Sequence, residues 1–172
     1  MSKASGLQKI ADQITRCRIC KKGKIGKPVP GEGNPKAKIV FLGEAPGKEE
    51  AKVGRPFVGR SGKLLRSLIR EIGLREKDVF ITSPVKYLPK YGTPKKSDIA
   101  HGRTHLLKQL AIIQPKIIVL LGNVAAEALS GKEIPAVYLK TCHPAAALRF
   151  PKYREMLKKD FRKLQRVIRD RR

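Results

Sequence analysis

Acidic residues, cysteines and long apolar runs are all scarce in this sequence. The 172 residues include 39 Lys and Arg but only 14 Asp and Glu, which gives a formal net charge of +25 at pH 7. No stretch approaches the roughly 20 consecutive apolar residues of a membrane helix, so we expect no membrane partner. The N-terminus has no apolar signal region and the chain has only three cysteines. These features predict an intracellular protein whose cysteines bind metal or lie in the core.

The charge imbalance indicates the kind of partner rather than the fold. A strongly basic chain is expected to bind a polyanion, and nucleic acid is the commonest one. The alternative is a lysine-rich, heat-adapted surface, but heat adaptation usually raises Glu together with Lys. Because acids are few here, we favour nucleic-acid binding, and we expect a cytoplasmic, nucleoid-associated protein.

The pattern of apolar residues predicts one α/β domain over residues 1–172. Four apolar runs bounded by turn residues predict buried strands at 37–42, 78–82, 116–121 and 136–139. Helical periodicity predicts helices near 7–14, 61–72, 97–113, 123–129 and 152–168, with Ser97 as the N-cap of the third. Strands that alternate with helices favour a three-layer α/β/α fold with a central, mostly parallel four-stranded sheet.

Polar loops follow three of the predicted strands and begin at Gly43, Ser83 and Thr141. In parallel sheets the ligand crevice lies outside the carboxyl ends of the strands, so these loops should converge. The first loop is much longer than a strand-to-helix connection requires. It carries a carboxylate, Glu44, at its start and an aromatic residue, Phe57, in a turn with a glycine on each side. We therefore expect this loop to contribute to function.

Five motifs resemble, in order, those of the family 4 uracil-DNA glycosylases. They are GEAPGKEE (43–50), GRPFVGRSGKLL (54–65), VFITSPVK (79–86), IIVLLG (117–122) and HPAAALR (143–149). With the upstream CRIC and PGEGNPKAKIVF segments, the resemblance covers about residues 7–157. It implies a monomeric DNA repair enzyme that flips uracil out of DNA and excises it by hydrolysis. Two alternatives remain open: a glycosylase for other deaminated or mismatched bases, and a catalytically inactive nucleic-acid-binding protein.

The resemblance also implies roles for individual residues. Glu44 would orient water or stabilise the cation-like sugar, and His143 would donate to the carbonyl oxygen of the departing base. Phe57 would stack on the base. Backbone N–H groups of the turn that contains Gly43 and Ala45 would cradle the base or a phosphate.

The sequence departs from the family pattern at two positions that would face DNA. Ser83 replaces the Asn that reads the base, and a hydroxyl is shorter and less selective than an amide. The alternative is that Ser83 only shapes the turn before Pro84. At the minor-groove wedge the family has a bulky residue where this chain has Ala147, and the adjacent Leu148 is the substitute. Arg149 would hold a phosphate.

A third departure concerns the metal site. The family binds a [4Fe–4S] cluster through four cysteines, but here two of those positions hold Tyr87 and Gly102. The remaining Cys-x2-Cys pair and a His-x3-His pair together form a zinc ligand set. The four candidate ligands are Cys17, Cys20, His101 and His105. We expect one structural metal, with zinc favoured and an iron–sulfur cluster or no metal as the alternatives.

Overall fold

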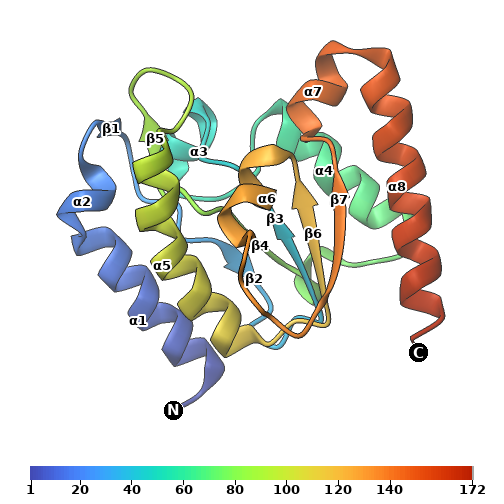
Figure 1. Cartoon of the computed structure of the whole chain (residues 1–172), viewed down its shortest axis with the longest axis horizontal. Helices are drawn as coiled ribbons and strands as arrows, with labels where there is room; N and C mark the ends of the chain where they lie inside the picture. Colours follow the sequence, from blue (N-terminus) through green and yellow to red (C-terminus); the bar gives the residue numbers. More distant parts are fainter. Residues whose placement is uncertain (172) are drawn as a thin grey trace.

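The computed structural model describes residues 1–171 as a central sheet between two layers of helices (Figure 1). The four predicted apolar runs form parallel strands, and these lie in the order β4, β3, β6, β7. Their bounds are β3 Ile39–Leu42, β4 Phe80–Thr82, β6 Ile117–Leu121 and β7 Val137–Thr141. The expected α/β/α architecture is therefore confirmed.

The expected number of strands was too small. The sheet has five strands, because β2 (Glu32–Gly33) pairs antiparallel with β4 at one edge. A second sheet consists of two short strands, β1 (Lys24–Ile25) and β5 (Leu88–Pro89). Each of these three strands has only two residues, too few to show any periodicity in the sequence.

The two faces of the sheet are covered by different helices. On one face Val40 and Leu42 of β3 pack with α5 (Lys96–Ile113) and α6 (Asn123–Leu129). On the other face Ile39 and Phe41 pack with α4 (Arg60–Glu71) and α8 (Pro151–Arg169). Because neighbouring residues of β3 point to opposite faces, a strand buried on both sides must be apolar throughout.

An N-terminal segment packs against the outside of α5. It contains α1 (Lys3–Arg16) and α2 (Arg18–Lys21). Ile10 and Ile14 of α1 form a small buried cluster with Cys20 and Tyr87. The N-cap of α5 is Lys95, two residues before the predicted Ser97, and the Lys95 N–H donates to the Asp98 carboxylate.

Two further helices lie where only loops were predicted. They are α3 (Lys48–Val53) and α7 (Pro144–Arg149). A short 3₁₀ helix, η1 (Glu76–Asp78), precedes β4. Among residues 1–171, no helix combines the length and the apolar character needed to cross a bilayer. Both α3 and α7 lie at the end of the molecule where the parallel strands terminate (Figure 1). They therefore border the crevice that the topology predicts.

Candidate active site and metal centre

A cavity of about 190 Å³ lies where the loops after β3, β4 and β7 meet. These loops contribute Ala45, Ser83 and His143 to its lining, and Phe57 forms another wall. The convergence expected from the parallel sheet is thus present. Glu44, which begins the first loop, is half-buried but is not among the residues that line this cavity. Burial raises the pKa of the Glu44 carboxyl.

Phe57 is held in an unusual backbone conformation. Its φ angle is 50°, in the left-handed region that a non-glycine residue rarely adopts. A Cβ atom added at Gly43 would lie 2.7 Å from the Phe57 ring, and one at Gly62 would lie 2.0 Å from the Phe57 carbonyl carbon. Both glycines are therefore required for the placement of this ring. The ring stacks against the imidazole of His143, with centroids 5.8 Å apart and an interplanar angle of 25°.

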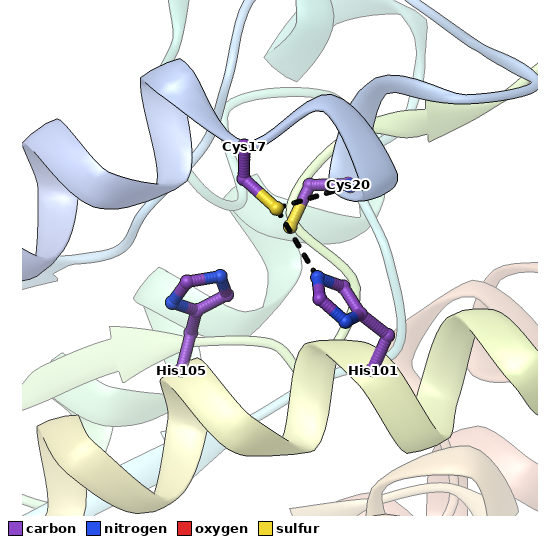
Figure 2. Close-up of side chains that lie close together, drawn as sticks. All are labelled: Cys17, Cys20, His101 and His105. Atoms are coloured by element: carbon purple, nitrogen blue, oxygen red, sulfur yellow. Dashed lines mark hydrogen bonds between the residues drawn. The ribbon is translucent and has the colours of Figure 1, made fainter.

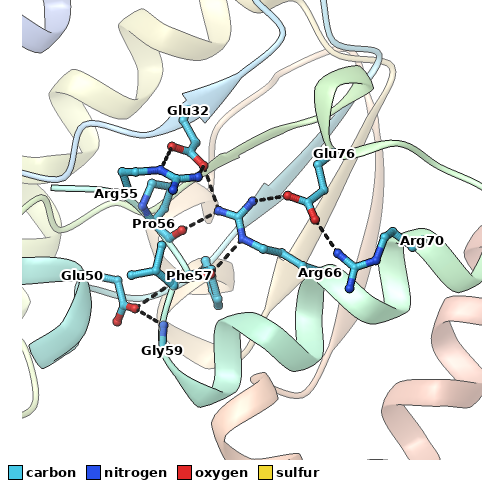
Figure 3. A network of polar contacts seen from close by, with 10 residues as sticks. Glu32, Glu50, Arg55, Pro56, Phe57, Gly59, Arg66, Arg70 and Glu76 are labelled. Atoms are coloured by element: carbon cyan, nitrogen blue, oxygen red, sulfur yellow. Dashed lines mark hydrogen bonds and ion pairs between the residues drawn. The ribbon is translucent and has the colours of Figure 1, made fainter. Parts of the chain in front are cut away.

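The guanidinium of Arg66 holds the backbone carbonyl groups of Pro56 and Phe57 (Figure 3). Its Nε donates to the Phe57 oxygen at 2.9 Å and its Nη2 to the Pro56 oxygen at 2.7 Å. Carboxylates of Glu32 and Glu76 pair with the same guanidinium at 2.9 and 2.8 Å. This contact could not be predicted from the sequence, because it depends on how the loop folds back over α4.

A second support of the loop is Glu50 of α3, whose carboxylate points at backbone N–H groups (Figure 3). It accepts hydrogen bonds from Val58 at 2.9 Å, Gly59 at 2.7 Å and Gly47 at 3.0 Å. The sequence analysis missed this residue, although Gly47-x-x-Glu50 has the spacing of a capping box. Glu50 therefore joins both turns that flank the cavity.

His143 caps the N-terminus of α7 with its ring. Its Nδ1 accepts a hydrogen bond from the Ala145 N–H at 3.0 Å. Burial lowers the pKa of His143, with the Glu50 carboxylate acting in the opposite direction. A neutral imidazole that accepts at Nδ1 must carry its proton on Nε2. His143 thus has one N–H available for a ligand in the cavity.

The Ser83 hydroxyl is already committed to the protein. It donates to the Val85 carbonyl oxygen at 2.7 Å, and the residue is buried. A hydroxyl has only one hydrogen to donate. Ser83 therefore supports the turn after β4 and offers a ligand only the lone pairs of its oxygen.

The three α7 residues proposed to contact DNA differ in exposure. Ala147 is 3% exposed and packs in the core with α4 and α8, so its side chain is not available to DNA. Leu148 is 37% exposed and Arg149 is also exposed. Both border an open cleft of about 390 Å³, together with Lys48 and Arg60. This cleft shares Glu50, Ser61 and Ala145 with the cavity beside it.

The four residues predicted to bind metal come together between the end of α1 and the face of α5 (Figure 2). Their sulfur and nitrogen atoms all lie within 4.8 Å of one another, and Cys17 Sγ lies 3.2 Å from His101 Nε2. A tetrahedral zinc site has ligand atoms about 3.3–3.8 Å apart, from bond lengths of about 2.3 Å to sulfur and 2.0 Å to nitrogen. The group is therefore at most about 1 Å wider than a bound zinc site, a difference that side-chain rotation can close.

Two observations show that these residues suit a cation. Both ring nitrogens of His105 are buried without a hydrogen-bond partner in the described part of the chain. Burial, with His101 beside it, lowers the pKa of His105 to about 4, so its ring is neutral and can donate a lone pair. Burial raises the pKa of the Cys20 thiol to about 12, so binding of a metal there would have to displace the thiol proton.

A four-cysteine cluster does not fit the same place. A Cβ atom at Gly102 would lie 2.0 Å from the Pro84 carbonyl oxygen, so a cysteine there requires the backbone to move. Tyr87 is buried, with its hydroxyl 3.4 Å from the Ile14 carbonyl oxygen. These positions are filled by packing, and the group can hold a metal only through its two cysteines and two histidines.

Comparison with known proteins agrees with the geometry. Residues 30–166 match the family model described as the uracil DNA glycosylase superfamily. A type-4 uracil-DNA glycosylase of Sulfurisphaera tokodaii is 40% identical over 94% of this chain and 84% of its own length. The corresponding proteins of Saccharolobus solfataricus and Archaeoglobus fulgidus are 41% and 37% identical, over 94% and 92% of this chain and 86% and 91% of their own lengths.

Proposed function

The chain belongs to the uracil DNA glycosylase superfamily, and from this premise we propose how it excises uracil from DNA. It is a DNA repair glycosylase that hydrolyses the bond between uracil and deoxyribose. The observation that carries the proposal is the cavity at the strand ends, where Phe57 and His143 face one space. A base inside a duplex cannot reach this space, so it must first be flipped out.

We assign each residue at the cavity a step in the reaction. Phe57 stacks on the flipped base, and the N–H groups of the Gly43–Ala45 turn cradle it. The neutral ring of His143 donates from Nε2 to the base oxygen that becomes negative as the bond breaks. Glu44, beside the cavity rather than in its lining, faces the sugar and orients water or stabilises the cation-like ring. Leu148 fills the space left by the base and Arg149 holds a phosphate.

The metal centre is proposed to be one structural zinc ion bound by Cys17, Cys20, His101 and His105. Zinc accepts two thiolates and two imidazoles in tetrahedral geometry. When bound, it would join α1 and α2 to α5 and would supply no chemistry to the reaction, since the residues at the base cavity are others. We further propose that the chain acts as a single-domain monomer in the cytoplasm, in association with the nucleoid.

A second candidate function rests on Ser83. The Ser83 hydroxyl donates its hydrogen to the Val85 carbonyl oxygen. The cavity therefore has, at this position, no amide that could both donate to and accept from the edge of a pyrimidine. Such a site would accept other deaminated bases. This candidate predicts excision of hypoxanthine or xanthine at rates comparable with that of uracil.

Replacing Ser83 with Ala distinguishes supporting the turn from reading the base. We expect the free energy of unfolding to fall by about 1 kcal/mol because one buried hydrogen bond is lost. Single-turnover uracil excision should slow by less than about tenfold, since the hydroxyl gives the base no hydrogen. A loss of about a hundredfold without loss of stability would mean that Ser83 contacts the base directly.

Replacing Arg66 with Met tests whether the loop must be held for excision. We expect the unfolding free energy to fall by about 2–3 kcal/mol, because two carbonyl groups lose their donor and two partly exposed carboxylates each keep only one arginine partner. Excision should slow by up to about a hundredfold, since small displacements of a positioned group are costly.

Arg70→Met is the matched control for this prediction. Arg70 is on the same helix and pairs with the same Glu76, but it does not reach the Phe57 turn (Figure 3). Because its side chain is exposed, the pair contributes at most about 1 kcal/mol. Equal rates for the Arg66 and Arg70 variants would show that the contact with the loop has no role in excision.

A further inference from the structure

The outer face of α8 concentrates positive charge beyond what the reaction requires. Its 19 residues include eight Lys and Arg against only Glu155 and Asp160. Seven of the eight basic side chains are exposed; they are Lys152, Arg154, Lys159, Arg162, Lys163, Arg166 and Arg169. By comparison, α1 has three basic residues and one acid, and α5 likewise has three and one. With six net positive charges, α8 carries more charge than α4, which has four basic residues and one acid, or than α1 and α5.

The spacing of these charges destabilises the helix itself. Lys159 and Lys163 are four residues apart, as are Arg162 and Arg166. Like charges at this spacing cost a helix about 0.2–0.5 kcal/mol for each pair. Within residues 1–171, the one ion pair that α8 forms joins Lys158 to Glu155, at 3.9 Å. A surface selected only for solubility would mix both signs, whereas this one suits a polyanion.

The other face of α8 restricts the kind of polyanion. Leu157, Phe161 and Leu164 are at most 2% exposed, because they form the core beneath the sheet. A helix that binds a bilayer must insert its apolar face into it. That face is already used here, so α8 can present only charge. The pattern suits the phosphate backbone of DNA.

The position of α8 separates this surface from the base cavity. The helix starts directly after α7 and runs along the side of the molecule towards the opposite end of the sheet (Figure 1). At 1.5 Å per residue it is about 28 Å long. Lys159 lies about 12 Å along the helix from Pro151, and the later basic residues lie still farther from the α7 end.

We propose that Lys159, Arg162, Lys163 and Arg166 bind a second segment of DNA while the first occupies the base cavity. The enzyme then passes directly from one segment to the other without becoming free in solution. This proposal rests on the proposed function, since it assumes that DNA is the substrate. It adds a second DNA-binding surface, and with it a route by which the enzyme searches for damage.

The test uses the variant K159Q/R162Q/K163Q/R166Q and a control of equal charge, K9Q/K36Q/K108Q/K132Q. The control lysines are exposed and lie outside α8. A labelled duplex with a stable abasic analogue is bound to each protein, and its dissociation rate is measured against rising concentrations of unlabelled, uracil-free duplex. For the unmodified and control proteins we expect the rate to rise with competitor concentration. For the α8 variant it should stay constant.

Two further measurements complete the test. The salt dependence of binding to uracil-free duplex should weaken by about 3–4 in log–log slope, close to 0.9 for each of four lost phosphate contacts. The α8 variant should excise uracil from a short oligonucleotide, under single-turnover conditions, at a rate within twofold of the unmodified protein. If all the proteins lacked excision, the proposed function would be contradicted rather than the second DNA-binding surface. A competitor dependence in the α8 variant equal to that of the control would overturn the proposal. The proposal would also be overturned if phosphatidylserine vesicles, at the same phosphate concentration, raised the dissociation rate of the labelled duplex as much as unlabelled duplex does.

Discussion

The His143→Asn variant is expected to excise uracil about a hundred to a thousand times more slowly than the unmodified enzyme, the usual effect of removing one donor to a developing oxyanion. The asparagine oxygen still caps α7 by accepting from the Ala145 N–H, which now bonds to His143 Nδ1 at 3.0 Å. The variant therefore keeps the cap and replaces the ring Nε2 donor with an amide N–H on a shorter side chain, which does not reach the same point. Single-turnover alkaline cleavage of a uracil oligonucleotide measures the rate, and urea unfolding measures stability.

His143→Ala separates the two functions of the ring. It loses both donor and cap, so we expect the same slow excision and a further loss of about 1 kcal/mol in unfolding free energy. A His143→Asn enzyme that kept its rate within about threefold would show that the Nε2 donor is not needed.

The excision rate should also resist mild acid. Burial lowers the pKa of His143, so in the folded enzyme the ring stays neutral below the ordinary histidine pKa of about 6.5. As the pH falls, His143 of the unfolded chain becomes protonated before His143 of the folded enzyme. The contribution of His143 to the free energy of unfolding is therefore complete above about pH 6.5, and it is lost as the pH falls through the pKa of His143 in the folded state.

A Cys20→Ser variant is expected to lose the proposed zinc ion and several kcal/mol of stability. Structural zinc contributes about 10–16 kcal/mol of binding free energy in small zinc-finger peptides, where it is the main source of folding. This chain has its own core, so the loss should be smaller but should still lower the unfolding midpoint clearly. Metal analysis of protein purified without added metal should find about one zinc per chain, a stoichiometry fixed by one four-ligand site.

Cys142→Ser provides the matched control. Cys142 is outside the metal group, and its thiol donates to the Tyr153 carbonyl oxygen at 3.3 Å. We expect this variant to keep its zinc. Iron, or no metal, in the unmodified protein would contradict the zinc assignment even if the Cys20 variant failed to fold.

The parallel strands of the sheet and the residues of the metal group could be predicted from the sequence for physical reasons. Strands buried on both faces are continuous apolar runs, and β3 and β6 show this plainly. Two cysteines three residues apart and two histidines four residues apart can each face one point from a single helical turn. In contrast, β2 has two residues, and its pairing with β4 depends on the partner strand, not on its own composition.

The residues that hold the active-site loop in place could not be predicted in the same way. Arg66 reaches carbonyls nine and ten residues before it, at positions that only the folded loop defines. Glu50 had a recognisable capping spacing, but its bonds to Val58 and Gly59 depend on the next turn. The burial of Ala147 follows from the packing of α7 against α4 and α8. Tertiary contacts determine all three.

The most direct test of the proposed function is excision from matched oligonucleotides that contain uracil, hypoxanthine, xanthine or a G·T mismatch. After incubation, alkali cleaves each strand at any abasic site. We expect cleavage of the uracil strand, with release of free uracil and little cleavage of the others. Comparable cleavage of hypoxanthine or xanthine would favour the broader glycosylase. Tight, salt-sensitive binding without any cleavage would contradict the assignment of an enzyme.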